Sequence, residues 1–242
     1  MTRASTGLHK LDAPTPFEVW RIDLAQHLEH VAIASLSEDE RARAARFVFT
    51  RDRDRYVSAH AALRELLAQR TGRAAGELRF GAGPQGKPYL LGTHNCSFNL
   101  SHSQDVALVV IADAGEIGVD VECLRAFPDA SELADRNYTA AERAELWARP
   151  AHDRDHGFLR CWTRKEACLK AVGSGLSIAP ETFETGLAPI ARTVDVVGSH
   201  GSHRVRVDTF DAGPGIVAAL ARIDAEDCPV PGPGHHMPHS RL

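Results

Sequence analysis

The sequence lacks any long hydrophobic run. Nowhere in its 242 residues do 18 apolar residues follow one another, and the first twenty contain no signal-peptide core. We therefore expect a cytoplasmic protein with no membrane partner. A dominant charge is missing too, since 28 Lys and Arg stand against 32 Asp and Glu, for a net charge of −4. Because both signs are interspersed, we expect no nucleic-acid partner, while a local anion site stays open.

Cysteine is sparse and shows no pairing pattern. The five cysteines are odd in number, scattered, and without a C-x-x-C pair. This disfavours both a disulfide framework and a structural zinc site. We expect small core residues or free thiols.

A complete phosphate-binding loop is also absent. Gly81, Gly86 and Lys87 fit G-x-x-x-x-G-K, but Pro88 replaces the required Ser or Thr and has no backbone N–H to cradle a phosphate. The segment that follows is typical of a strand, not of the required helix. This excludes a P-loop ATPase and leaves Lys87 as a candidate phosphate contact.

What the sequence does contain is an arrangement that occurs twice. Ser37 with Glu40, and Thr139 with Glu142, form capping boxes, and each box precedes a long helical segment. Helices are predicted over 36–47, over the arginine-rich segment up to Gly72, after Thr139, and over about 156–172. Strands are predicted at 17–24, 78–80, 88–91, 97–101, 106–112, 204–210 and 215–223.

These elements predict an α+β fold of two similar α/β halves related by a pseudo-twofold axis. Each half would be a small sheet packed with helices, and the active site would lie in the cleft between them. We place the halves at 1–114 and 115–226. The Pro-, Gly- and His-rich tail at 227–242 is predicted to be disordered.

The stretch "GVDVE" (118–122) places two carboxylates in an apolar run. In a strand, Val119 and Val121 face one side while Asp120 and Glu122 face the other. Taken alone, such a pair usually belongs to the solvent-exposed face of a surface strand. Its meaning changes with the helix at 160–177, where Glu166 and a lysine one turn later could complete an oxygen-ligand site for Mg²⁺ beside a phosphate.

Two further groups could take part in this site. Ser101 and His102 end a strand in "FNLSHS" (98–103), but adjacent strand residues face opposite sides and no G-x-S-x-G elbow is present, so a Ser-His hydrolase is rejected. An arginine-rich junction, from which one or two side chains could clamp a phosphate, contains Arg43, Arg46, Arg51, Arg53 and Arg55.

Together these motifs resemble one family. "GKP" (86–88), "FNLSHS", "GVDVE" and "WTRKEACLKAVGSGLS" (162–177) occur in the order seen in 4′-phosphopantetheinyl transferases of the long, two-half type. The resemblance spans roughly residues 36 to 180. It implies transfer of the 4′-phosphopantetheine arm of coenzyme A to a serine of an apo acyl or peptidyl carrier protein, with release of adenosine 3′,5′-bisphosphate.

The resemblance also implies roles for individual residues. Asp120, Glu122 and Glu166 would bind Mg²⁺ and, with Lys170, form the catalytic set. The base toward the serine would be Glu166, with Glu122 or a metal-bound water as alternatives. The implied contacts to coenzyme A are Arg43, Arg55, Lys87, Ser101, His102, Asp120, Lys165 and Lys170.

A monomer is expected, because two halves in one chain supply the cleft. Two other functions stay open at this point. One is a non-catalytic coenzyme A or nucleotide-binding module, and the other is a metal-dependent phosphatase.

Overall fold

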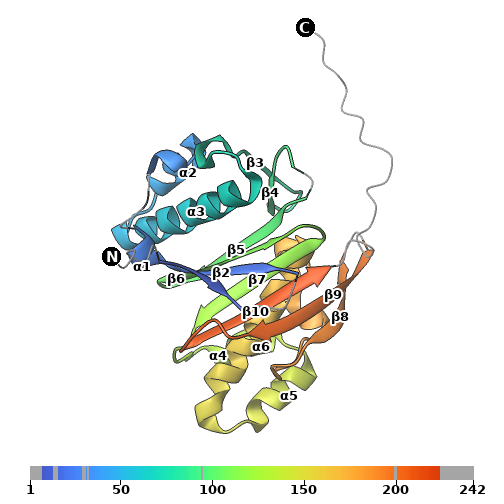
Figure 1. Cartoon of the computed structure of the whole chain (residues 1–242). Helices are drawn as coiled ribbons and strands as arrows, with labels where there is room; N and C mark the ends of the chain where they lie inside the picture. The colour runs from blue at the N-terminus through green and yellow to red at the C-terminus, as the bar shows by residue number, and fades with distance from the viewer. Residues whose placement is uncertain are drawn as a thin grey trace.

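The computed structural model of the chain describes residues 7–12, 16–28, 31, 33–93, 95–198 and 201–223. Two four-stranded sheets lie between two long helices (Figure 1), α3 (Thr50–Thr71) and α6 (Ala151–Val172). Both helices have 22 residues and end at a glycine in the left-handed conformation, Gly72 and Gly173. Within the described part of the chain, no helix is long and apolar enough to cross a membrane.

The first half begins with a strand pair and ends with the hairpin that closes its sheet. Its elements are β1 (Leu8–Leu11), β2 (Glu18–Asp23), α1 (Leu24–Leu28), η1 (Ile33–Ser35), α2 (Glu38–Ala44), α3, η2 (Ala75–Glu77), β3 (Phe80–Ala82), β4 (Pro88–Leu90), β5 (Ser97–Ser103) and β6 (Val106–Ala112). The sheet order is β1-β2-β6-β5, with antiparallel neighbours, while β3 and β4 form a separate hairpin.

The second half has the same plan with its extra strand at the other edge. Its elements are β7 (Glu116–Cys123), α4 (Ala130–Asn137), α5 (Ala140–Ala148), α6, η3 (Gly175–Ser177), η4 (Pro180–Thr182), β8 (Arg192–Gly198), β9 (Gly201–Phe210) and β10 (Ile216–Ile223). The sheet order is β7-β10-β9-β8, again antiparallel throughout.

Each half places its strands in the same spatial order. Three strands of each half share one order, β2-β6-β5 in the first half and β7-β10-β9 in the second, in which the strand that precedes the long helix pairs with the last strand of its half. In both halves the long helix falls between the first strand and the final pair. The predicted fold of two similar halves is confirmed.

The cores follow from strand alternation. One face of each sheet packs against its own long helix, and the opposite faces pack on each other through β2, β6, β7 and β10. Val119 and Val121 are fully buried in this inter-sheet core, as the alternation predicts. Removing a valine side chain from water contributes about 1.5 kcal/mol or more, so these residues fix the register of β7.

Both predicted capping boxes are confirmed. The Ser37 hydroxyl accepts the Glu40 N–H at 3.2 Å, and the Ser37 N–H donates to the Glu40 carboxylate at 2.8 Å. Thr139 and Glu142 repeat the pattern at 3.2 and 2.9 Å. Each box satisfies two backbone donors that the start of a helix leaves unpaired.

The glutamate of each box also receives a buried cation from the long helix. Arg64 donates to Glu40 at 2.6 Å and to the carbonyls of Ala75 and Leu78. Lys165 pairs with Glu142 at 2.8 Å and donates to the carbonyls of Pro180 and Phe183. This contact ties α2 to α3 and α5 to α6 in the same way.

Several element predictions need correction. Strands β1 and β8 and helix α4 were not predicted, and α6 begins at Ala151, five residues before the expected start. The boundary after residue 114 stays a prediction, and it falls in the turn 113–115 between β6 and β7. The tail at 227–242 lies outside the described residues. The four described cysteines are free thiols.

Candidate active site

The two halves meet where edge strand β5 runs along the free edge of β7. The Val119 N–H donates to the Asn99 side-chain oxygen at 2.9 Å, and the Cys123 N–H donates to the Ser103 hydroxyl at 3.2 Å. An unpaired strand edge exposes backbone donors, and here alternate side chains of β5 satisfy them in place of another strand. This places β5 beside the carboxylates of β7.

Asp120 is the centre of a buried polar network. Its side chain projects from β7, and one carboxylate oxygen, Oδ1, accepts the Ser101 hydroxyl at 2.8 Å and the Lys170 ammonium at 2.6 Å. Lys170 also donates to the Ser101 hydroxyl at 2.9 Å. Burial raises the pKa of Asp120, and the bonds from Lys170 and Ser101 oppose that increase. The Lys170 ammonium therefore pairs with Asp120 of its own half and donates across the junction to Ser101, and it does not pair with Glu166 one turn earlier.

Glu122 lies two residues further along β7 and is held similarly. Its Oε2 accepts the Ser103 hydroxyl at 2.7 Å. Burial raises the pKa of Glu122, the Ser103 bond lowers it, and the negative charge of Asp120 raises it again. Serine hydroxyls of β5 thus donate hydrogen bonds to both carboxylates of the motif.

Glu166 comes from the face of α6 that packs on β7. Burial is the main cause that raises the pKa of Glu166, followed by the charges of Asp120 and Glu122, while Lys170 lowers it. Among the described residues its carboxylate has no hydrogen-bond or ion-pair partner. The charges of Asp120 and Glu122 therefore act on Glu166, which places the three acids in one electrostatic environment.

Gly118 allows α6 to approach β7. A Cβ atom at Gly118 would lie 2.2 Å from the Ala167 carbonyl oxygen and 2.4 Å from the Ala171 backbone nitrogen. Both contacts are to backbone, so a side chain could be accommodated only by moving the helix. Gly118 therefore leaves room for the helix that carries Glu166 and Lys170.

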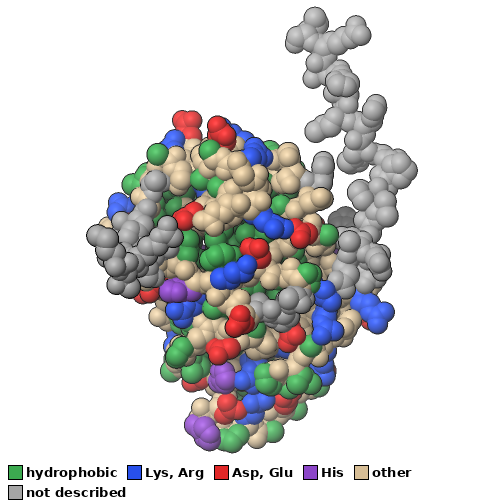
Figure 2. All heavy atoms as spheres, in the orientation of Figure 1, with side chains coloured by type: hydrophobic (Ala, Val, Ile, Leu, Met, Phe, Trp, Pro, Cys, Tyr) green, Lys and Arg blue, Asp and Glu red, His purple; other side chains and the backbone are tan. Residues whose placement is uncertain are grey.

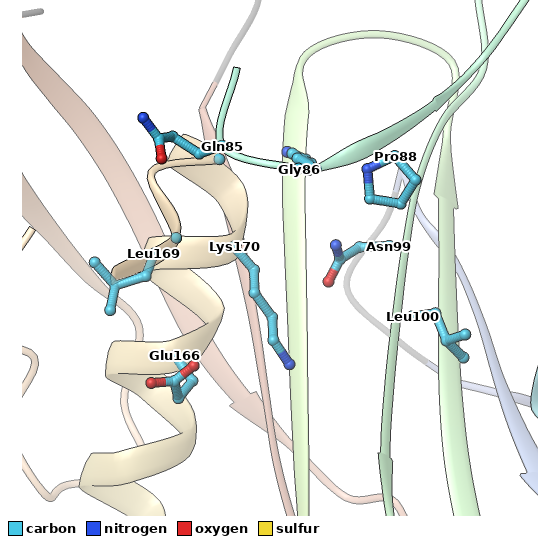
Figure 3. A pocket seen from close by; sticks show the side chains of 11 residues that line it. Gln85, Gly86, Pro88, Asn99, Leu100, Glu166, Leu169 and Lys170 are labelled. Atoms are coloured by element: carbon cyan, nitrogen blue, oxygen red, sulfur yellow. The ribbon is translucent and has the colours of Figure 1, made fainter. Parts of the chain in front are cut away.

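A cavity of about 320 Å³ opens beside these groups. The first half contributes the loop 85–88 and β5, and the second contributes α6 and the turn after it (Figure 3). Figure 3 shows Lys170 extending from α6 towards β5, opposite Asn99, with Glu166 one turn earlier on the helix. The predicted cleft between the halves is therefore present, with Glu166 and Lys170 on its wall.

Lys87 also lines this cavity, and its ammonium already has partners. Its ammonium pairs with Glu116 at 2.5 Å and donates to the Ala171 carbonyl at 2.9 Å, at the end of α6. Contact with a phosphate would require Lys87 to exchange at least part of this coordination.

The remaining predicted cations surround the start of α3. His102 lies on the face of β5 opposite Ser101, and its pKa is lowered by desolvation, then by His60, Lys170 and Arg55. Arg55 donates to Asp105 at 2.9 Å in the turn after β5. Arg43 lies over the ring of Tyr56, 5.4 Å from its centroid. On the face seen in Figure 2, positive and negative side chains are interspersed, which agrees with the sequence.

Lys165 does not belong to this site, and its expected contact with coenzyme A is corrected. Its side chain is 2 % exposed, and its ammonium is taken up by Glu142 and two carbonyls in the core of the second half. Neighbouring residues on a helix are about 100° apart, so Glu166 faces the junction while Lys165 faces α5.

The three carboxylates fit a divalent cation chemically. Mg²⁺ prefers carboxylate oxygens, and a cation would relieve the mutual repulsion that contributes to the raised pKa values of Glu122 and Glu166. Asp120 also has a buried oxygen, Oδ2, with no hydrogen-bond partner in the described structure. In the present geometry, no three His, Cys, Asp or Glu side chains among the described residues could hold a metal ion. The Lys170 ammonium is instead the cation on Asp120.

Sequence reasoning missed two contributors. Ser103 bonds Glu122, and Glu116 holds Lys87, yet neither was assigned to the site. The S-x-S spacing of "SHS", which matches the D-x-E spacing of β7, is the signal that could have identified Ser103. No pattern indicates Glu116, because its partner is 29 residues away.

Family models match both halves of the chain. The model of the 4′-phosphopantetheinyl transferase superfamily matches residues 116–217, and that of the 4′-phosphopantetheinyl transferase N-terminal domain matches residues 20–115. The two matches meet in the turn between β6 and β7. The chain is a member of the 4′-phosphopantetheinyl transferase family.

Individual relatives agree with this assignment. The 4′-phosphopantetheinyl transferase HetI of Nostoc is 38% identical over 177 residues, which cover 71% of this chain and 74% of the relative. The 4′-phosphopantetheinyl transferase Sfp of Bacillus subtilis is 24% identical over 198 residues, covering 81% and 86%. Both matches extend across the two halves, so the resemblance includes the junction where the site lies.

Proposed function

We propose that the site moves the 4′-phosphopantetheine group of coenzyme A onto a serine of an apo acyl or peptidyl carrier protein. Adenosine 3′,5′-bisphosphate is the leaving product. The observation that carries this proposal is the convergence of Asp120, Glu122, Glu166 and Lys170 beside a cavity at the junction of the halves. Phosphoryl transfer needs such a set, because it depends on positioning and on neutralising developing charge.

Asp120, Glu122 and Glu166 would hold Mg²⁺. When bound, Mg²⁺ would neutralise charge on the pyrophosphate of coenzyme A and help to align it. The carboxylates are suited to this because they come from two rigid elements, β7 and α6, that Gly118 allows to pack closely.

The chain's own residues would carry the remaining steps. Glu166 takes the proton of the incoming serine hydroxyl, because it lines the cavity and its carboxylate has no hydrogen-bond or ion-pair partner among the described residues. The serine oxygen forms a bond to the β-phosphorus as the bond from that phosphorus to the bridging oxygen breaks. Lys170 neutralises charge on the departing bisphosphate. No covalent enzyme intermediate is required.

Further residues are proposed to bind the nucleotide portion. Lys87, at the cavity wall, and His102, Arg55 and Arg43, around the start of α3, would contact phosphates of coenzyme A. Ser101 would hold Lys170 in position. We propose that the chain acts as a monomer, since both sides of the cavity come from one chain.

The decisive experiment combines the purified protein, coenzyme A, Mg²⁺ and several apo carrier proteins, and measures the intact mass of each carrier. We expect a gain of one phosphopantetheine group, abolished by Asp120→Ala or by chelation of Mg²⁺. No mass gain on any carrier would overturn the proposal.

The same samples separate the two other functions. Binding of coenzyme A that Asp120→Ala leaves intact, without any transfer, would favour a binding module. Release of phosphate from coenzyme A in the absence of a carrier would favour a phosphatase. For the proposed transferase, adenosine 3′,5′-bisphosphate should appear in proportion to modified carrier.

A further inference from the structure

A pair of serines on β5 matches the pair of carboxylates on β7. Ser101 donates to Asp120 and Ser103 donates to Glu122, and in both cases the two residues are 19 positions apart in the chain. The constant offset means that β5 and β7 run side by side in the same direction. The S-x-S of the first half therefore lies against the D-x-E of the second.

Both serines use their hydroxyl groups in the same way. The Ser101 oxygen accepts the Lys170 ammonium at 2.9 Å while its proton goes to Asp120. The Ser103 oxygen accepts the Cys123 N–H at 3.2 Å while its proton goes to Glu122. An accepted hydrogen bond directs the hydroxyl proton, so each serine is a fixed donor and not a freely rotating one.

In each carboxylate, one oxygen accepts these hydrogen bonds and the other accepts none within the described residues. Asp120 uses Oδ1 for Ser101 and Lys170 and leaves Oδ2 buried without a partner in the described structure. Glu122 uses Oε2 for Ser103, and within the described residues no hydrogen bond reaches Oε1. The arrangement fixes the rotation of both carboxylates while keeping one oxygen of each for a cation.

We infer that Ser101 and Ser103 are positioning residues for the magnesium ligands, and that the first half thereby sets the metal affinity of a site whose carboxylates all lie in the second. The inference rests on the proposed function for the identity of the metal. Outer partners that orient ligating side chains typically change metal affinity by about 10- to 100-fold when they are removed. Ser103 gives the cleaner test, because Ser101 also touches Lys170.

The test measures Mg²⁺ titrated calorimetrically into protein saturated with coenzyme A, without carrier. Ser103→Ala should weaken Mg²⁺ binding about tenfold, and Ser103→Thr, which keeps the hydroxyl, should restore most of it. The matched control is Ser97→Ala on the same face of β5. The Ser97 hydroxyl donates to the Gly115 carbonyl at 2.6 Å and to no carboxylate, so we expect less than about a twofold change.

Transfer kinetics supply an independent readout. In Ser103→Ala the Mg²⁺ concentration for half-maximal rate should rise about tenfold, while kcat at saturating Mg²⁺ changes little. If Ser103→Ala does not fold, Ser103→Cys replaces it. That variant keeps the approximate size but donates weakly, and it should show the same loss. Urea unfolding of each variant separates a loss of affinity from a loss of fold.

The outcomes distinguish this inference from the proposed function. Wild-type Mg²⁺ affinity in a folded Ser103→Ala variant, with normal transfer by the parent, would overturn the inference alone. Weakened Mg²⁺ binding in that variant, together with a parent that modifies no carrier, would support the inference and overturn the transferase. A parent that binds no Mg²⁺ in the presence of coenzyme A would overturn both.

Discussion

The two halves of the molecule share their supporting contacts and differ in their chemistry. Arg64 and Lys165 are each the fifteenth residue of a 22-residue helix, and each pairs with the glutamate of the preceding capping box. Each cation also lies near an aromatic ring, Phe80 or Phe183, about 5 Å from its centroid. The repeated contact has the same structural role in both halves.

The contacts differ at the two residues that lie one and five positions further along each helix. In α3 they are Glu65 and Gln69, which hydrogen-bond each other at 3.4 Å. In α6 they are Glu166 and Lys170, and Lys170 pairs with Asp120 on β7 and donates across the junction to Ser101. The first strand differs as well: β2 packs Trp20 and Ile22 towards its helix, where β7 presents carboxylates. One scaffold thus supports an apolar core at these positions in the first half and a polar site in the second.

The largest expected effect is a loss of transfer rate on substitution of the sixteenth residue of α6, with no such loss at the sixteenth residue of α3. Glu166→Gln should lower the rate of carrier modification by about 10²- to 10⁴-fold, because the proposed base and metal ligand is lost. Glu65→Gln, at the matching position of α3, should change the rate by less than about twofold. Initial rates with matched urea unfolding curves provide the measurement. Equal losses in both variants would mean that the halves do not differ as proposed.

The next effect concerns the buried cations. Lys165→Met should lower the free energy of unfolding by about 3 to 5 kcal/mol, because Glu142 would be left buried and unpaired. Arg64→Met should lower the free energy of unfolding by less, because the side chain of Glu40 is 12% exposed and can still be solvated, whereas that of Glu142 is only 1% exposed. Urea denaturation checks both values. The double variant Lys165→Met/Glu142→Leu should recover much of the loss, and failure to recover would show that the cost is not an unpaired charge.

The smallest expected effect is the pH dependence of the free energy of unfolding that the Glu40–Arg64 pair contributes. Burial alone would raise the pKa of Glu40, but bonds from His60, the Ser37 N–H and Arg64 lower it from 4.5 to about 2. Because the folded pKa is the lower one, this stabilisation is complete above pH 4.5 and is lost as the pH falls from 4.5 towards 2. At pH 3.5 the loss should be about 1.4 kcal/mol.

Comparison of the parent with Glu40→Gln isolates that dependence. The difference between their unfolding free energies should shrink as the pH falls from 5.5 to 3.5, measured by urea denaturation. Glu142 also has a lowered pKa, mainly because the Lys165 pair outweighs burial, so Glu142→Gln should show the same sign. A difference that stays constant or grows on acidification would contradict the proposed charge pairing.

Much of this organisation is local in the chain and could be predicted. A capping box spans four residues, and strand alternation at Val119 and Val121 is visible in any short window. Such signals predict the starts of α2 and α5, the two halves and the orientation of Asp120. The grouping of Asp120 with Glu166 required the family resemblance as well, because they are 46 residues apart.

What could not be predicted depends on contacts between distant segments. The burial of Lys165 follows from acceptors at Pro180 and Phe183, which no helix pattern reveals. The role of Gly118 depends on how closely α6 packs on β7. The partner of Ser103 depends on β5 and β7 lying side by side, although they are not paired in one sheet.

The contact between β5 and β7 also decides which pieces of this enzyme can be exchanged. A chimera that joins the first half of one relative to the second half of another would preserve each sheet and each long helix. It would nevertheless combine serines and carboxylates that did not evolve against each other. The natural unit for grafting is therefore the strand pair 97–103 and 116–123, taken together from a single parent, even though the boundary between the halves runs between them.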